Sequence, residues 1–429
     1  MRRAYFLKLL KIPMEYVILI PSKMKVVKLC SDFKYGNDRK QRGDTVRNVV
    51  IAIDSFKGSL TTFQAGQAVK EAVNDIYPDA QVIVSPIADG GEGTVDAIIS
   101  ATNGEKVKVI VTNPLGKKIE ATYGWIPDTQ TAVMEMSQAA GITLIDGNQR
   151  NPMDTTTFGV GEMILDAIAK GCRKFVIGIG GSATNDGGVG MLQALGFGFL
   201  DKNGNQVPFG AKGLKELAVI QTENAVKELK ECSFSVACDV KNVLCGEDGC
   251  SAIYGPQKGA TPAMIADMDS WLKNYATLTK SVIPNADDNA PGTGAAGGMG
   301  FALLTFLGAK LESGIGLVIR ETGLEKHIMD ADLVVTGEGR LDGQSSMGKA
   351  PVGVATMAKK HHKPVIAFAG SVTEDAVEAH TYGVDAFFPI VRKPCNLDEA
   401  MYADNAYQNL RNTAYQVFRL IRTMRGYDE

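Results

Sequence analysis

The amino-acid sequence predicts an α/β fold: a Rossmann-like three-layer domain into which a second α/β domain is inserted. Short β-branched strands alternate with amphipathic helices at both ends of the chain, in residues 48–100 and again after residue 291. The middle of the chain instead has short strands separated by tight turns. At 429 residues the chain also exceeds the usual size of one hydrophobic core, so more than one domain is expected.

The N-terminal alternation starts with a strand at residues 48–54. Apolar residues between Phe63 and Ile76 then recur at the spacing of one helical face, and a second strand follows at residues 81–85. A glycine-containing loop leads from that strand into a helix that starts at Thr94. This order is typical of parallel strands joined by helical crossovers.

The middle of the chain predicts an antiparallel meander followed by mixed structure. Turn signals such as Asn113–Gly116 separate short strands at residues 107–111, 118–125 and 131–136. A helix, a strand and a long amphipathic helix are then predicted at residues 157–170, 174–179 and 262–280. We assign residues 101–285 to the inserted domain.

The alternating pattern returns in the last third of the chain. It predicts a helix, a strand, a helix, two strands and a final helix, at residues 295–308, 332–336, 350–361, 364–369, 385–389 and 397–424. Residues 47–100 and 286–429 are therefore predicted to form the Rossmann-like domain together.

The first residues do not match the pattern that follows. Their apolar stretch is interrupted by Lys8, Lys11 and Glu15, so it lacks a hydrophobic segment long enough for a signal peptide. We expect residues 1–46 to be an accessory or spurious extension, and we hypothesise that translation starts at Val46. No apolar run in the sequence approaches the roughly 18 residues of a membrane span.

Composition excludes some classes of function. The chain has 45 Lys and Arg residues against 48 Asp and Glu, a net charge of −3, so no overall positive field favours nucleic acid or an anionic membrane. Its 7 cysteines include no Cys-x-x-Cys pair, which argues against a zinc site or a disulfide framework. Reduced thiols are the simpler interpretation. We expect a cytoplasmic protein that acts on small molecules.

Two glycine-containing loops near the N-terminus carry charged residues suited to ligands. In the loop 54–61, Lys57 lies between hydroxyl residues at the start of a helix and could hold an anion together with the free helix amides. Alternatively, the hydroxyl residues only cap the helix. In the loop 88–94, Asp89 and Glu92 are framed by glycines and could bind a metal or a polyhydroxy substrate, or could only cap the next helix.

Two further loops contain Gly-x-Gly patterns of the kind found in dinucleotide-binding proteins. The loop 178–188 follows a predicted strand, and its Asp186 is a candidate base or metal ligand, or a residue that only shapes a turn. The loop 291–300 has no strand before it. Its small residues would allow a phosphate to approach a helix N-terminus closely, unless its glycines serve only close packing.

The loop 336–351 is the most specific of the five. Gly343 to Lys349 fits Gly-x4-Gly-Lys, the start of a Walker A loop, but an alanine follows where that loop needs a hydroxyl for Mg²⁺. Lys349 and exposed amides could still bind phosphate. Glu338 and Asp342 are the nearest carboxylates for a metal ion.

Together these segments resemble the motifs of the type-1 glycerate kinase family. The matching stretches are DSFKGSLT (54–61), ADGGEGT (88–94), GGSATNDGG (180–188), GPQKGA (255–260), GTGAAGGMG (292–300) and GEGRLDGQSSMGK (337–349). The stretch CDVKN (238–242) also resembles a segment of that family, with a mild departure at the next residue, Val243, where proline is common. The resemblance spans residues 48–425 in order. It implies ATP-dependent phosphorylation of D-glycerate with Mg²⁺, in a cleft between the two domains, with 2-phosphoglycerate favoured over 3-phosphoglycerate as the product.

The resemblance and the loops together give a hypothesis for the site. A base would accept the hydroxyl proton of glycerate while cations and amides neutralise the transferring phosphoryl group. The candidate catalytic residues are Asp186, which is preferred as the base, Asp239 and Lys57. The candidate substrate-binding residues are Ser55, Lys57, Asp89 and Arg340. The candidate nucleotide-binding residues are Gly181, Ser182, Asn185, Gly294, Gly297, Gly298 and Lys349, and the candidate metal ligands are Glu338 and Asp342.

Two other functions remain open from the sequence. The Gly-x-Gly patterns would suit an NAD(P)-dependent oxidoreductase acting on a hydroxy acid, with Asp201 as the downstream carboxylate. A non-catalytic sensor of sugar acids would need a DNA-binding element, and no basic helix suited to that role stands out.

Overall fold

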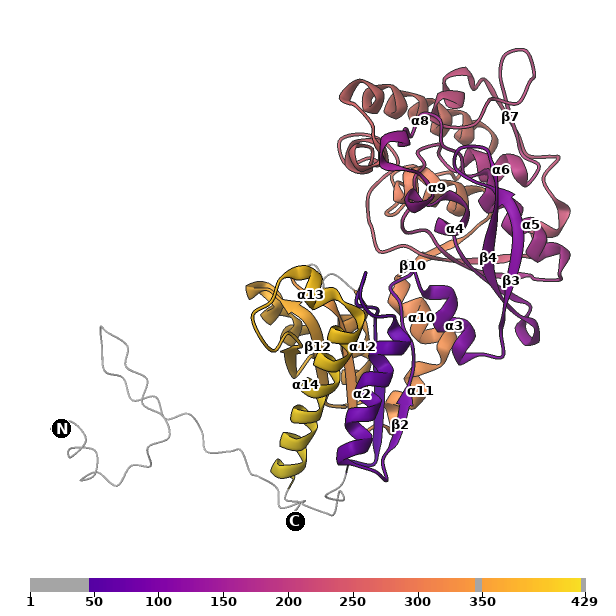
Figure 1. Cartoon of the computed structure of the whole chain (residues 1–429). Helices are drawn as coiled ribbons and strands as arrows, with labels where there is room; N and C mark the ends of the chain where they lie inside the picture. Colours follow the sequence, from indigo (N-terminus) through magenta and orange to yellow (C-terminus); the bar gives the residue numbers. More distant parts are fainter. Residues whose placement is uncertain (1–45, 344–348, 426–429) are drawn as a thin grey trace, which may run out of the picture. The chain divides into compact units, whose positions relative to one another are not determined.

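The computed structural model describes residues 46–343 and 349–425. The predictions for the N-terminal extension, apart from Val46, and for residues 344–348 of the Walker-like segment therefore lie outside the described residues. Two large sheets and a small two-stranded one organise the described part of the chain (Figure 1).

A five-stranded sheet combines strands from the two ends of the chain. Its order is β13-β12-β11-β1-β2, and all its pairings are parallel. The strands are Asn48–Ile53 (β1), Gln81–Val84 (β2), Leu333–Leu341 (β11), Val365–Val372 (β12) and Ala386–Pro389 (β13). The strands predicted in the two end segments are thereby confirmed, although β11 continues to Leu341.

Helices cover both faces of this sheet, which gives three layers. Ile51 of β1 packs in a core with α2 (Thr62–Ile76) and α14 (Ala403–Met424), two helices that lie side by side (Figure 1). Its neighbour Val50 belongs to the opposite core, which contains α12 (Ala350–Lys360). This division follows from the alternation of side chains along a strand.

The connections of this sheet diverge between β1 and β11. From β1 the chain passes through α2 to β2 on one side, whereas β11 leads to β12 and β13 on the other. Ile53 pairs with Gly337, and the amide of Asp54 donates to the Gly337 carbonyl at 3.0 Å. In open parallel sheets, ligands bind beyond the carboxyl ends of the strands at such a point. The loops after β1 and β11 are therefore placed to form a site.

A six-stranded mixed sheet follows the order β10-β9-β6-β5-β4-β3. Its strands are Glu105–Thr112 (β3), Lys118–Ile126 (β4), Thr131–Glu135 (β5), Lys174–Gly178 (β6), Ser233–Ala237 (β9) and Lys310–Glu312 (β10). β3, β4 and β5 pair antiparallel, which confirms the predicted meander, and the other pairings are parallel. The sequence prediction misses β10, because so short a strand carries no period-two pattern.

Aromatic and aliphatic side chains fill the core around this second sheet. The helices that contribute are α5 (Phe158–Ala169), α6 (Val189–Ala194), α8 (Pro262–Val282) and α9 (Ala295–Phe306). Tyr275 of α8 is fully buried, and its ring lies edge-on to that of Phe301 of α9, with 5.3 Å between centroids. Both α9 and β10 follow residue 285, where the predicted insert ends; the domain division itself stays a prediction.

The helices differ from the sequence prediction at two places. The predicted final helix is two helices, α13 (Leu397–Met401) and α14, because Tyr402 between them has a non-helical backbone. The helices α10 (Gly314–Thr322) and α11 (Leu324–Asp330) are missed altogether. None of the helices in residues 46–343 and 349–425 is long and apolar enough to cross a membrane.

Candidate active site

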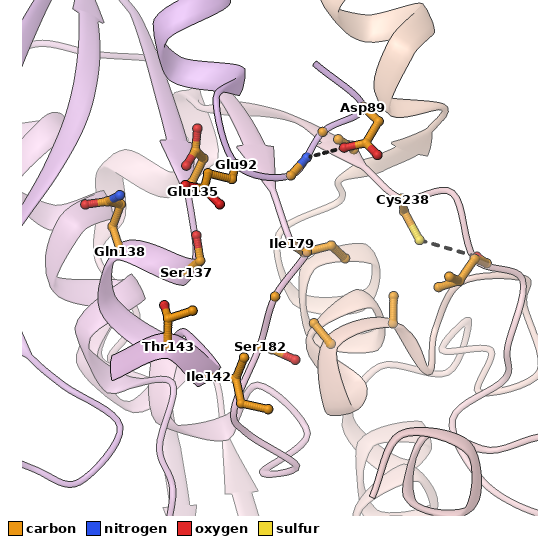
Figure 2. Close-up of a pocket in the computed structure, with 18 of the residues that line it drawn as sticks. Asp89, Glu92, Glu135, Ser137, Gln138, Ile142, Thr143, Ile179, Ser182 and Cys238 are labelled. Atoms are coloured by element: carbon orange, nitrogen blue, oxygen red, sulfur yellow. Dashed lines mark hydrogen bonds between the residues drawn. The ribbon is translucent and has the colours of Figure 1, made fainter. Parts of the chain in front are cut away.

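Two adjoining cavities lie beyond the carboxyl ends of strands from the two large sheets. Their volumes are about 820 and 470 Å³. The loops of the larger cavity (Figure 2) contribute, among others, Gly181, Ser182, Asp239 and Lys258. The loops of the smaller cavity contribute, among others, Asp54, Ser55, Glu338, Arg340, Asp342 and Lys349. Lys57 and Asp89 line both cavities, so the two cavities meet at this pair.

The loop after β1 presents Lys57 because another residue caps the helix that follows. Thr61 forms a capping box with Gln64 at the start of α2. Gly58 has a φ of +77°, which turns the chain sharply just after Lys57. The Lys57 side chain is 73% exposed, and its Nζ lies 3.9 Å from Asp89 Oδ2. Thr61 therefore caps the helix, as in the alternative considered from the sequence, and the Lys57 side chain faces the cavities.

Asp54 is a buried carboxylate at the end of β1. Its Oδ1 accepts a hydrogen bond from the Ser55 amide at 2.6 Å. Burial raises the pKa of Asp54 to about 7, and the nearby carboxylates of Asp89 and Glu338 add to the effect. The sequence prediction does not single out Asp54, although it opens the first of the predicted loops.

The loop after β2 presents Asp89 and Glu92 to the larger cavity. Asp89 Oδ1 accepts from the Gly91 amide at 3.2 Å, and neither carboxylate caps α3 (Thr94–Ala101). That role falls to Glu135 of β5, whose Oε1 accepts from the Val95 amide at 3.0 Å. Figure 2 shows Glu135 close to Glu92. Burial raises the pKa of Glu135.

Asp239 follows β9 and lines the larger cavity. Its Oδ1 accepts from the Gly314 amide at the start of α10, at 3.0 Å. Burial raises the pKa of Asp239, and the charge of Asp89 adds to it. The structure therefore brings Asp239, Asp89 and Lys57, all predicted site residues, to one cavity.

The loop after β6 divides into a part that lines the cavity and a part that does not. Gly181 and Ser182, two of the predicted nucleotide-binding residues, lie in the wall of the larger cavity. Asn185 is fully buried and donates to the Ser251 hydroxyl at 2.8 Å, and it lines neither cavity. Its buried hydrogen bond stabilises the loop without contact to either cavity.

Asp186 also lies outside both cavities. It is 1% exposed, and Oδ2 accepts from the amide and hydroxyl of Thr157, each at 2.8 Å. The amides of Gly188 and Gly190 donate to the same carboxylate. Of the two predicted bases, the structure thus exposes Asp239 to the cavity and encloses Asp186 in a buried turn, the alternative considered for it from the sequence.

The predicted nucleotide-binding glycines of the loop 291–300 serve close packing. A Cβ on Gly294 would come within 2.1 Å of the Val243 carbonyl oxygen, and one on Gly297 within 2.0 Å of the Thr184 carbonyl oxygen. A Cβ on Gly298 would likewise crowd Gly187, at 2.7 Å. The neighbouring residues 295–296 are the part of this loop that reaches the larger cavity.

The loop after β11 brings charged residues to the smaller cavity. Arg340 Nε lies 3.4 Å from Asp342 Oδ2, and Lys349 Nζ lies 4.0 Å from Asp342 Oδ1. Glu338 lines the same cavity and is 8% exposed. Carboxylate oxygens of this kind suit Mg²⁺. Within residues 46–343 and 349–425, however, no three His, Cys, Asp or Glu side chains are grouped to hold a metal, so phosphate oxygens and water would have to complete its shell.

A lysine that sequence reasoning missed lies in the wall of the larger cavity. Lys258 is 2% exposed, and its Nζ donates to Ser182 Oγ at 2.9 Å and to the Thr184 carbonyl at 2.6 Å. Burial lowers the pKa of Lys258 to about 8. The available signal was its place in GPQKGA (255–260), a motif quoted for the resemblance but assigned no role.

Comparison with known proteins agrees with this arrangement of loops. A family model described as "Glycerate kinase family" matches residues 49–422. The chain belongs to the glycerate kinase family. It is a phosphotransferase, and as a kinase of this family it uses ATP. Neither the family model nor the relatives support the oxidoreductase alternative.

The relatives of this kinase match it over nearly their whole length. The glycerate 2-kinase of Escherichia coli K12 is 49% identical over 368 residues, which are 85% of this chain and 97% of the relative. The glycerate kinase of Haemophilus influenzae is 44% identical, over 87% of this chain and 98% of its own. A crystal structure of a glycerate kinase 2 from Salmonella typhimurium LT2 has a TM-score of 0.81 at 44% identity, covering 89% of this chain and 99% of that one.

The enclosure of Asp186 predicts a structural role that can be separated from catalysis. We expect Asp186→Asn to lower the free energy of unfolding by roughly 1–3 kcal/mol, because an amide cannot accept from all the donors that surround the carboxylate. Urea unfolding would measure the loss, and kcat of the folded kinase should stay nearly unchanged. A fall in kcat of roughly 10²–10⁴ with unchanged stability would instead identify Asp186 as the base.

The raised pKa of Asp54 predicts a pH-dependent cost in stability. Between the ordinary carboxyl range and pH about 7, the folded kinase binds a proton at Asp54 that the unfolded chain has lost. Stability from this group therefore falls as pH rises through that window. We expect Asp54→Asn to raise the melting temperature at pH 8 and to leave it unchanged at pH values below the ordinary carboxyl range. Equal shifts at both pH values would contradict this assignment.

Proposed function

We propose that the enzyme transfers the γ-phosphoryl group of ATP to the 2-hydroxyl of D-glycerate, with Mg²⁺, to give ADP and 2-phosphoglycerate. The observation that carries the proposal is the meeting of two cavities at Lys57 and Asp89, which would let two substrates approach one point from different sides. The choice of the 2-hydroxyl is supported by the relative named glycerate 2-kinase, at 49% identity.

The smaller cavity is suited to the nucleotide. It lies at the point where the connections from β1 and β11 diverge, and its wall includes the apolar side chains of Ile390, Leu397 and Met401. Such a surface would accommodate an adenine ring. Its volume of about 470 Å³ is in the range of small-molecule sites.

The charged end of that cavity is suited to phosphate. Lys57, Arg340 and Lys349 supply positive charge there, and Ser55 supplies a hydroxyl at the end of β1. Phosphoryl transfer depends on positioning and on neutralising the charge of the phosphoryl oxygens, which lysine and arginine donors do. Asp342 and Glu338 would hold Mg²⁺ at this end of the cavity, and the ion would supply positive charge that neutralises the phosphoryl oxygens.

We assign the role of base to Asp239 instead of Asp186. Asp239 reaches the larger cavity and neighbours Asp89, whereas Asp186 is occupied by internal donors. A raised pKa also makes Asp239 a better proton acceptor than an ordinary carboxylate. Asp89, which lies beside Lys57, would orient the substrate hydroxyl where the cavities meet.

The assignment of Asp239 predicts a specific loss of turnover. We expect Asp239→Asn to lower kcat by roughly 10²–10⁴, because an amide cannot accept the hydroxyl proton. The KM for ATP should change little. The matched control is Asp128→Asn, on the exposed turn between β4 and β5, which should leave kcat unchanged. Normal turnover by Asp239→Asn would exclude the residue as the base.

The identity of the product is tested by incubating the enzyme with ATP, Mg²⁺ and D-glycerate. We expect phosphorus NMR to show a phosphate ester on the 2-hydroxyl. Enolase added alone should then consume the product, because enolase acts on 2-phosphoglycerate directly. A product that enolase consumes only after phosphoglycerate mutase is added would be 3-phosphoglycerate and would refute the regiochemistry.

A further inference from the structure

Lys258 is a buried lysine whose hydrogen bonds go to neutral groups. Lysine is almost never fully buried unless it is paired, yet Lys258 is 2% exposed. Its two hydrogen-bond partners are the neutral Ser182 hydroxyl and the Thr184 carbonyl. Within the described parts of the chain it forms no ion pair, and the charge of the buried Asp186 offsets the effect of burial on the pKa of Lys258 only in part. An ammonium has three donors, so one N–H of Lys258 remains for a ligand.

The surroundings of Lys258 offer further donors to an anion. Ser182 Oγ accepts from Lys258, so its own O–H hydrogen is available to donate to another group. Gly181 precedes it with a φ of +72°, a left-handed turn of the kind in which successive amides can bind an anion. A Cβ on Gly181 would meet only Ser137 Cβ, at 3.6 Å. The backbone there is therefore open to close approach from the cavity.

The negative charges elsewhere in the wall of the larger cavity favour a small anion over a highly charged one. Its wall also contains the carboxylates of Asp89, Glu92, Glu120, Glu135 and Asp239. A polyphosphate would be repelled by this wall. A small hydroxy acid would not, because its hydroxyl groups can donate to carboxylates while its single negative charge needs one cation.

We propose that Lys258 and Ser182 form the subsite that binds the carboxylate of D-glycerate. The inference rests on the proposed function and deepens it, because it assigns the acid to the larger cavity. In this arrangement the carboxylate lies against the loop after β6, and the hydroxyl groups point toward Asp239 and Asp89. It also moves Gly181 and Ser182 from nucleotide binding to substrate binding, and it frees Lys57 and Arg340 for the phosphates.

Burial gives this subsite its strength. A charge-assisted hydrogen bond is stronger than a neutral one, and more so where water is excluded. The bound carboxylate would also compensate a cation that burial otherwise penalises, as the lowered pKa of Lys258 indicates. The subsite should therefore contribute strongly to affinity for glycerate and little to affinity for ATP.

Steady-state kinetics of Lys258→Met and Ser182→Ala test the proposal. We expect Lys258→Met to raise the KM for D-glycerate by about 10- to 100-fold, and Ser182→Ala to raise it less, because each removes a charge-assisted hydrogen bond. The KM for ATP should be unchanged in both. The matched control is Lys273→Met, which removes an exposed lysine of α8 and should change neither constant. A rise in the KM for ATP with that for glycerate unchanged would overturn the proposal.

A neutral analogue separates binding of charge from a merely structural role. D-glyceramide keeps the hydroxyl groups of glycerate but carries no negative charge. We expect Lys258→Met to leave the inhibition constant of D-glyceramide unchanged and to weaken the binding of D-glycerate. Equal weakening of both ligands would show that Lys258 only shapes the loop, and would overturn the proposal.

A second variant and a wild-type control cover the cases in which Lys258→Met does not fold or the proposed function is wrong. If Lys258→Met does not fold, Ser182→Ala is used for the same comparison of the two ligands, because it removes only one hydroxyl group from the subsite and leaves the buried lysine in place. If Ser182→Ala changes the binding of D-glycerate and of D-glyceramide by the same factor, the proposed subsite is refuted. If the proposed function itself is wrong, the wild-type enzyme will not phosphorylate D-glycerate when it is incubated with ATP and Mg²⁺.

Discussion

The parallel pairing of β1 with β11 is the constraint on which the rest of the site depends. It joins segments almost three hundred residues apart, and the amides of Arg47 and Asn48 strengthen it by donating to Asp332. Because the connections leave these strands in opposite directions, the loops after them are not covered by a crossover helix. Lys57, in the loop after β1, can therefore face both cavities, and Asp89 meets it there from the loop after β2.

Electrostatic strain follows from that geometry. Asp54, Asp89 and Glu338 lie near one another at the strand ends, and burial together with mutual repulsion raises the pKa of Asp54 to about 7. Asp239 and Glu135 are also shifted upward. Carboxylates gathered in this way cost stability in the free protein. They are typical of functional sites, where a substrate or metal ion offsets the repulsion.

The sequence predicts the strands and loops well because each carries a local signal. Strand–loop–helix alternation gives the five-stranded sheet, and turn signals give the meander of β3, β4 and β5. The short β10 and the helices α10 and α11 are missed, since their positions are decided by packing against distant elements. The break between α13 and α14 has no glycine or proline to announce it.

The roles of residues within the loops are harder to predict. Asp186 lies in the glycine-rich loop after β6 and Asp239 comes just after β9, yet only tertiary contacts decide that Thr157 encloses the first while the second faces the cavity. Likewise, the clash distances at Gly294 and Gly297 reveal packing that a Gly-x-Gly pattern does not distinguish from ligand binding. The sequence does not single out Lys258, because its importance comes from its burial, and burial of a lysine cannot be predicted from one sequence.

A crystal structure of the enzyme with D-glycerate, Mg²⁺ and a non-hydrolysable ATP analogue would show whether the two substrates reach one transfer point from two separate cavities. We expect the adenine against Ile390 and Met401, the glycerate in the cavity of Asp239, and the γ-phosphate beside Lys57. A structure with the nucleotide in the cavity of Asp239, or with both ligands far from Lys57, would contradict it.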